Sequence, residues 1–127
     1  MGRRAERTRN GGTWTEAAFW GAVRSCLRDR FKWWKPIKVA KDRARRKYEG
    51  EKRRQKWEYQ CAMCSEWFKG DEVQVDHIVP CGSLRCYEDI AGFLERLCCE
   101  DIDGFRVLCK ICHQQITNEE RRRKNAL

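Results

Sequence analysis

CAMC, residues 61–64, and CKIC, residues 109–112, are the two short stretches that decide how this chain folds. Two thiolates at CxxC spacing can reach one Zn²⁺ at about 2.3 Å, and two such pairs complete a closed tetrahedral site. The 44 residues between the pairs exceed the gap of an ordinary zinc ribbon. We therefore predict a structural zinc that clamps both ends of a long insertion, with a redox CxxC pair as the alternative. The predicted ligands are Cys61, Cys64, Cys109 and Cys112.

The insertion contains VQVDHIVP, residues 73–80, which is typical of a strand entering a core yet carries Asp76 and His77. Burying polar groups costs free energy unless they are paired or bind something, so this pair is a candidate site. The chain has two histidines, and the other, His113, directly follows the last cysteine of CKIC. The zinc clamp would bring both histidines close together. Histidines with a purely structural role are the alternative.

These motifs together resemble the HNH endonucleases. The matching segments are CAMC, VDHIVP at 75–80 and the run from LCKICH to Thr117 at 108–117. The likeness is to zinc-bearing members encoded by bacteriophages and mobile elements and to phage junction-resolving endonucleases, and it covers residues 59 to about 120. WTEAAFWGAVRS, residues 14–25, is also similar to the N-terminal part of small phage HNH proteins.

The resemblance implies an α+β fold with a ββα-metal (His-Me finger) core, clamped by the four-cysteine zinc site and preceded by an N-terminal helical extension. It implies a Mg²⁺- or Mn²⁺-dependent endonuclease that hydrolyses DNA phosphodiester bonds by nicking or double-strand cleavage. His77 would be the general base, and Asp76 and His113 would hold the catalytic ion. A neutral imidazole can accept a proton from water, and a carboxylate with one imidazole leaves coordination positions open for water and phosphate.

The sequence departs from the HNH pattern in DIDGFRVLC, residues 101–109, where the middle Asn of the motif is expected and Gly104 stands. We expect Asp103 to replace this Asn, by orienting the loop or the imidazole, with Asp101 as the alternative. Ile116 occupies a position where the family often has Lys. Two arginines, Arg85 and Arg106, are candidates to neutralise the scissile phosphate, with a plain surface position as the alternative for each.

Charge is unevenly distributed along the chain. Residues 1–60 carry 19 Lys or Arg against 7 Asp or Glu, residues 61–120 carry 5 against 12, and residues 121–127 add 4 basic residues. This pattern predicts a polyanionic partner, with an ordinary solvated surface as the alternative. We expect residues 1–58 to form a basic helical extension that contacts nucleic acid, with phosphate contacts favoured over 38–56, and residues 59–127 to form the nuclease domain.

Local patterns give further expectations. Residues 1–12 are predicted to be a flexible arm, Thr13 to Glu16 a capping box that starts a helix, and Pro36 the end of that helix. Residues 37–57 are predicted to form one or two exposed helices, with disorder as the alternative. Residues 87–99 should contain a helix, 104–109 a strand, and 110 onward a terminal helix.

Composition excludes some functional classes. No apolar run is long enough to span a membrane, and the basic N-terminus lacks the apolar region of a secretory signal. We therefore expect a cytoplasmic protein, in an infected bacterial cell if it is phage-encoded, whose nine cysteines are metal ligands or thiols. Expected partners are DNA and phage packaging or recombination proteins. The alternatives are a non-catalytic zinc module that binds nucleic acid or protein, and a nuclease active only within a complex.

Overall fold

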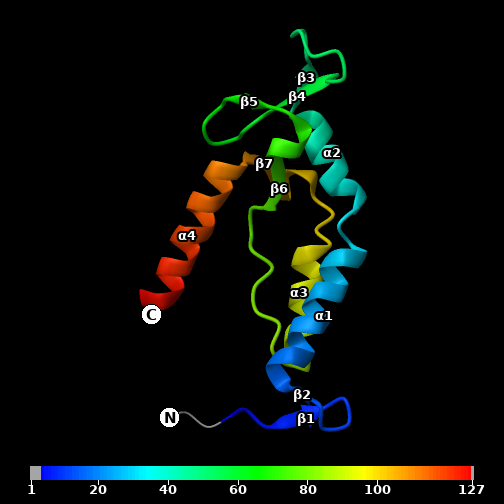
Figure 1. Cartoon of the computed structure of the whole chain (residues 1–127), viewed down its shortest axis with the longest axis vertical. Helices are drawn as coiled ribbons and strands as arrows, with labels where there is room; N and C mark the ends of the chain where they lie inside the picture. The colour runs from blue at the N-terminus through cyan, green and yellow to red at the C-terminus, as the bar shows by residue number, and fades with distance from the viewer. Residues whose placement is uncertain (1–3, 127) are drawn as a thin grey trace. The chain divides into compact units, whose positions relative to one another are not determined.

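Two separate cores organise the chain, and each belongs to a different unit of the fold. In the computed structural model, which describes residues 4–126, the first unit comprises Met1–Trp34 with Val79–Cys99, and the second comprises Lys35–Ile78 with Glu100–Leu127. Across the described residues the chain is mixed α+β, with four helices and three small sheets (Figure 1). The division differs from the boundary expected at residues 58 and 59, because 79–99 packs with the N-terminal helix.

The core of the first unit lies between helices α1 (Glu16–Arg30) and α3 (Ile90–Leu97). Trp20 on α1 and Phe93 on α3 are almost completely buried, together with Leu84 from the connecting segment that precedes the short 3₁₀ turn η2 (Tyr87–Asp89). Apolar residues at helical spacing form the two facing stripes. The predicted helix within 87–99 is therefore confirmed, and it buries its apolar side in this unit.

A small hairpin precedes α1. Strands β1 (Arg7–Arg9) and β2 (Trp14–Thr15) pair antiparallel across a turn in which Asn10, Gly11 and Gly12 have φ values of 52°, 65° and 83°. Positive φ favours Asn and Gly, which the sequence supplies. The predicted flexible arm is thus wrong for residues 7–9, while residues 1–3 lie outside the described residues.

The start of α1 lies slightly later than the capping box predicted. Thr15, and not Thr13, is the N-cap, and its Oγ1 accepts a hydrogen bond of 3.1 Å from the backbone N–H of Ala18. Thr13 instead donates its hydroxyl to the carbonyl of Asn10 in the hairpin turn. Thr13 therefore belongs to the hairpin turn, although the sequence pattern placed it at the start of the helix.

The second unit is built around an antiparallel pair of strands, β6 (Val73–His77) and β7 (Phe105–Cys109). Val73 lies opposite Cys109, and Asp76 lies opposite Arg106. Helix α4 (Lys110–Ala126) follows β7 without a loop, and α2 (Lys35–Arg43) contacts both strands. The strands and the terminal helix predicted from the sequence are confirmed.

A three-stranded sheet occupies part of the region where helices were predicted. Helix α2 ends at Arg43, and β3 (Arg45–Lys47), β4 (Trp57–Gln60) and β5 (Trp67–Phe68) pair antiparallel in that order. The helical prediction for 44–57 is therefore wrong. Aromatic residues that alternate with polar ones favour a strand at 57–60, and the tertiary pairing with β5 outweighs the helical propensity of the basic residues.

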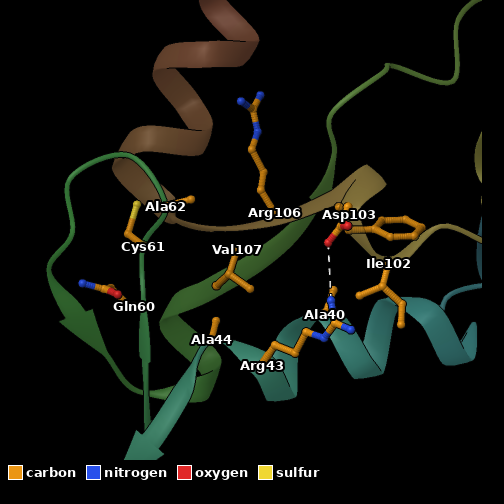
Figure 2. Close-up of a pocket in the computed structure, with 11 residues that line it drawn as sticks. Ala40, Arg43, Ala44, Gln60, Cys61, Ala62, Ile102, Asp103, Arg106 and Val107 are labelled. Atoms are coloured by element: carbon orange, nitrogen blue, oxygen red, sulfur yellow. Dashed lines mark hydrogen bonds and ion pairs between the residues drawn. The ribbon is translucent and has the colours of Figure 1, made fainter.

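A hollow of about 300 Å³ lies in the second unit between α2, the turn after β4 and β7 (Figure 2). Arg43 on α2 and Asp103 in the 3₁₀ turn η3 (Ile102–Gly104) form an ion pair beside it, with 3.4 Å between Nη1 and Oδ1. Cys61 and Arg106 line this hollow, whereas Asp76, His77 and His113 do not. Among residues 4–126, no helix is both long enough and apolar enough to cross a bilayer.

Candidate functional site

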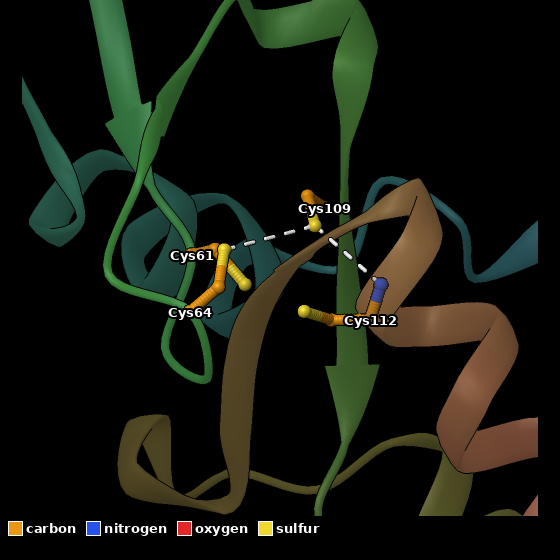
Figure 3. A group of neighbouring side chains, drawn as sticks. All are labelled: Cys61, Cys64, Cys109 and Cys112. Atoms are coloured by element: carbon orange, nitrogen blue, oxygen red, sulfur yellow. Dashed lines mark hydrogen bonds between the residues drawn. The ribbon is translucent and has the colours of Figure 1, made fainter.

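The first cysteine pair lies in the turn that joins β4 to β5. The carbonyl of Cys61 accepts a hydrogen bond of 3.0 Å from the N–H of Ser65, and the N–H of Cys61 donates to the carbonyl of Glu66 at 2.9 Å. Ser65 has a φ of 63°, the left-handed conformation that glycine adopts most easily. This tight turn brings Cys64 back beside Cys61 (Figure 3).

The second pair lies where β7 passes into α4. Cys109 is the last residue of the strand, and Cys112 lies in the first turn of the helix. The backbone N–H of Cys112 points at Cys109 Sγ over 3.5 Å. A hydrogen bond links the segments that carry the two pairs, since the N–H of Ala62 donates to the carbonyl of Val107 at 2.8 Å.

The four thiols have the arrangement of a metal site. Their Sγ atoms all lie within 4.8 Å of one another, and Cys64 Sγ is 4.0 Å from Cys109 Sγ. Sulfurs at about 2.3 Å from a tetrahedral zinc would lie about 3.8 Å apart, so a small contraction satisfies the geometry. Within the described part of the chain, this is the one group of three or more candidate ligand side chains. The four cysteines can therefore hold a metal ion such as zinc.

The electrostatics of the thiols agree with a cation site. Burial would raise the pKa of the Cys61 thiol, but hydrogen bonds from the backbone of Cys109 and Cys64 outweigh it and lower that pKa to about 6. The neighbouring Cys109 side chain, followed by burial, raises the pKa of Cys112 to about 12. Such opposite shifts are expected when like charges share one small space. A divalent cation would relieve this repulsion and allow all four thiols to ionise.

The structure brings Asp76 and His113 together on the side of the strand pair that faces α4. Asp76 Oδ1 lies 3.8 Å from His113 Nε2, and Asp76 Oδ2 accepts a hydrogen bond of 3.1 Å from Arg106 Nε. The Asp76 side chain is 20% exposed and that of His113 is 32% exposed. A carboxylate oxygen and an imidazole nitrogen thus converge at a partly open position, where His113 directly follows the last cysteine of the cluster.

His77 is the last residue of β6. Its ring packs edge-on against Phe105, the residue opposite it in the strand pair, with 4.8 Å between ring centroids. Successive side chains of a strand point to opposite faces, so His77 and Asp76 leave the strand in different directions. The chain then exits the strand pair at Ile78, whose N–H donates to the carbonyl of Gly104 at 2.9 Å.

The loop before β7 is held by Asp101. Its carboxylate accepts a hydrogen bond of 2.9 Å from the backbone N–H of Asp103 and caps η3. The Asp103 side chain is 87% exposed and pairs with Arg43. Within this loop, the Asp101 side chain bonds the backbone, whereas that of Asp103 pairs with Arg43.

Sequence reasoning missed the partnership of Arg106 with Asp76. Arg106 was a candidate phosphate contact, whereas in the structure it binds the carboxylate, and Figure 2 shows its side chain pointing away from Arg43 and Asp103. Only the register of β6 against β7 could have revealed the pair, and no local pattern sets that register. Arg85, the other candidate, belongs to the first unit, where its backbone N–H donates to Asp89.

The site is therefore defined by its own geometry. It consists of a four-cysteine cluster fit for a metal and an Asp–His–Arg group on β6, β7 and α4. Comparison of the chain with family models, with curated proteins and with solved structures finds no match in any of the three.

Proposed function

We propose that this protein is a metal-dependent HNH endonuclease that hydrolyses DNA phosphodiester bonds and carries a structural zinc. The observation that carries the proposal is the approach of Asp76 Oδ1 to His113 Nε2, 3.8 Å apart, on a strand–strand–helix arrangement beside the four-cysteine cluster. These are the two residues that the HNH resemblance assigns to the catalytic ion. The order β6, β7, α4 also supports a ββα-metal core.

The proposal gives each side chain a separate task. Asp76 and His113 would hold Mg²⁺ or Mn²⁺, which when bound supplies electrostatic stabilisation of the charge that develops on the phosphate. Arg106 orients the Asp76 carboxylate by donating to Oδ2, so that Oδ1 faces His113. An imidazole nitrogen of His77 accepts a proton from the attacking water. The products would be a 5′-phosphate and a 3′-hydroxyl.

The zinc would have a structural task only. Cys61 and Cys64 lie in the turn that joins β4 to β5 of the three-stranded sheet, whereas Cys109 ends β7 and Cys112 lies in α4. One ion bound to all four joins these two parts of the second unit. It thereby fixes the start of α4, and with it His113, relative to β6.

The test is cleavage of supercoiled, linear, branched and single-stranded DNA by the purified protein with Mg²⁺ or Mn²⁺. His77→Ala should keep zinc and DNA binding yet lose cleavage by about 10²–10⁴-fold, because a positioned general base contributes that much. Gln74→Ala is the matched control, since Gln74 is an exposed residue of the same strand.

Two outcomes would contradict the proposal. One is a His77→Ala protein that cuts as fast as the parent at saturating metal. The other is a zinc-loaded parent protein without metal-dependent cleavage of any of these substrates, alone or with partner proteins. The Asp76–Arg106 ion pair would then be structural, and the chain a zinc-containing module that binds nucleic acid or protein.

A further inference from the structure

The hairpin of β3 and β4 carries a concentration of positive charge that the proposed cleavage site does not use. Residues 45–56 contain seven Lys or Arg and two Glu. Six of the seven basic residues are exposed, and one of the six, Arg46, pairs with Glu58, whereas the other five form no ion pair within residues 4–126. They are Lys47, Lys52, Arg53, Arg54 and Lys56.

The hairpin loop has a defined structure. The N–H of Tyr48 donates to the carbonyl of Lys56 at 2.9 Å, which extends the pairing beyond the strands, and the N–H of Gln55 donates to the carbonyl of Lys52 at 3.1 Å. The Tyr48 ring lies directly against Gly50, where an added Cβ would come within 2.1 Å of the Tyr48 hydroxyl. The basic side chains therefore project from an ordered loop, which Figure 1 shows extending past β3 and β4.

The aromatic residues at the base of the hairpin already have cationic partners. The Arg45 guanidinium lies 4.0 Å from the centre of the Trp57 ring, and the Arg46 guanidinium lies 3.7 Å from that of Trp67. Single-strand binders stack bases on open aromatic faces, and a face covered by a guanidinium is not open. The hairpin is therefore better suited to bind phosphates through its charged side chains than to stack bases on its aromatic rings.

We propose that the β3–β4 hairpin is a binding arm that lies in a groove of double-stranded DNA, with its basic loop on the phosphates of the backbone. A two-stranded ribbon fits the major groove, which is about 12 Å wide. The chemistry of the loop predicts contacts that position the duplex without reading its sequence. The inference rests on the proposed function only for the choice of DNA as the polyanion.

The experiment measures duplex binding by fluorescence anisotropy over a series of salt concentrations, with no Mg²⁺ or Mn²⁺ added so that cleavage plays no part. In the loop variant, four residues of the full chain are replaced by Gln: Lys52, Arg53, Arg54 and Lys56. In the matched control, four exposed residues at the end of α4 are replaced by Gln: Arg121, Arg122, Arg123 and Lys124. Both variants lose the same charge from the same unit, and circular dichroism with zinc content checks their folding.

The loop variant should bind duplex DNA at least about 10-fold more weakly than the parent, and its log–log salt slope should be smaller by about 3–4, because each phosphate contact contributes about 0.9. The control should change much less, and the parent should prefer duplex to single strand. Equal losses in both variants, or tighter binding of single strand, would overturn the inference. A protein that never cleaves but whose loop variant loses duplex binding would refute the nuclease proposal and leave the binding arm standing.

Discussion

Replacing Cys109 by Ser tests the metal centre most directly. Cys109 is buried and ends β7, and its sulfur lies 4.0 Å from Cys64 Sγ of the other pair and 3.5 Å from the backbone N of Cys112. A serine hydroxyl cannot replace a thiolate ligand, so the site would keep three of its four sulfurs. We expect the variant to lose bound zinc and, with it, the fold of the second unit.

The magnitude follows from how few buried apolar side chains surround the four thiols themselves. The buried cluster around the site comprises Leu108 and three of the four cysteines, supported by Phe68 and Ile116. Full burial of a leucine stabilises by about 1.5–3 kcal/mol, whereas a structural zinc contributes about 10–16 kcal/mol at neutral pH. Because a whole domain is stable by only about 5–15 kcal/mol, loss of the metal exceeds what the apolar contacts can offset.

The assay is zinc content per chain after gel filtration, combined with thermal unfolding followed by circular dichroism. Cys26→Ser is the matched control, since Cys26 is an exposed cysteine of α1 outside the cluster. The parent and the control should retain one zinc per chain and unfold at the same temperature. Cys109→Ser should lack zinc and should not show the parent's unfolding transition. A Cys109→Ser protein that keeps both zinc and the parent's unfolding temperature would refute the reasoning, as would a folded parent without zinc.

Two further predictions concern single side chains. Asp76→Ala should weaken Mn²⁺ binding and lose cleavage that partly returns at high Mn²⁺, as measured by metal titration in the cleavage assay; a loss that is indifferent to metal concentration would contradict a ligand role. Phe93→Ala removes a fully buried ring from the first unit and should lower the free energy of unfolding by about 3–5 kcal/mol in denaturant titrations, whereas a loss under about 1 kcal/mol would show that this core is not the one described.

Local sequence patterns were sufficient for several elements and for the metal cluster. CxxC spacing places two thiols within reach of one ion, and the presence of two such pairs predicted the grouping of Cys61, Cys64, Cys109 and Cys112 that the structure confirms. The strands at 73–77 and 105–109 and the helices at 90–97 and 110–126 also carry clear signals. The strands and helices depend on side-chain periodicity, and each cysteine pair depends on ligand chemistry, both of which neighbouring residues express without help from distant parts of the chain.

Only the tertiary structure decided the remaining features, because each depends on residues far apart in sequence. The register of β6 against β7 places Arg106 on Asp76, and a slip of one residue would have sent Arg106 to the opposite face. Packing of α3 on α1 assigns 79–99 to the first unit. Pairing of β3 with β4, which in turn pairs with β5, makes the basic segment after Arg43 a hairpin. Hydrogen bonds to a neighbouring strand outweigh the weak helical preference of an exposed charged segment.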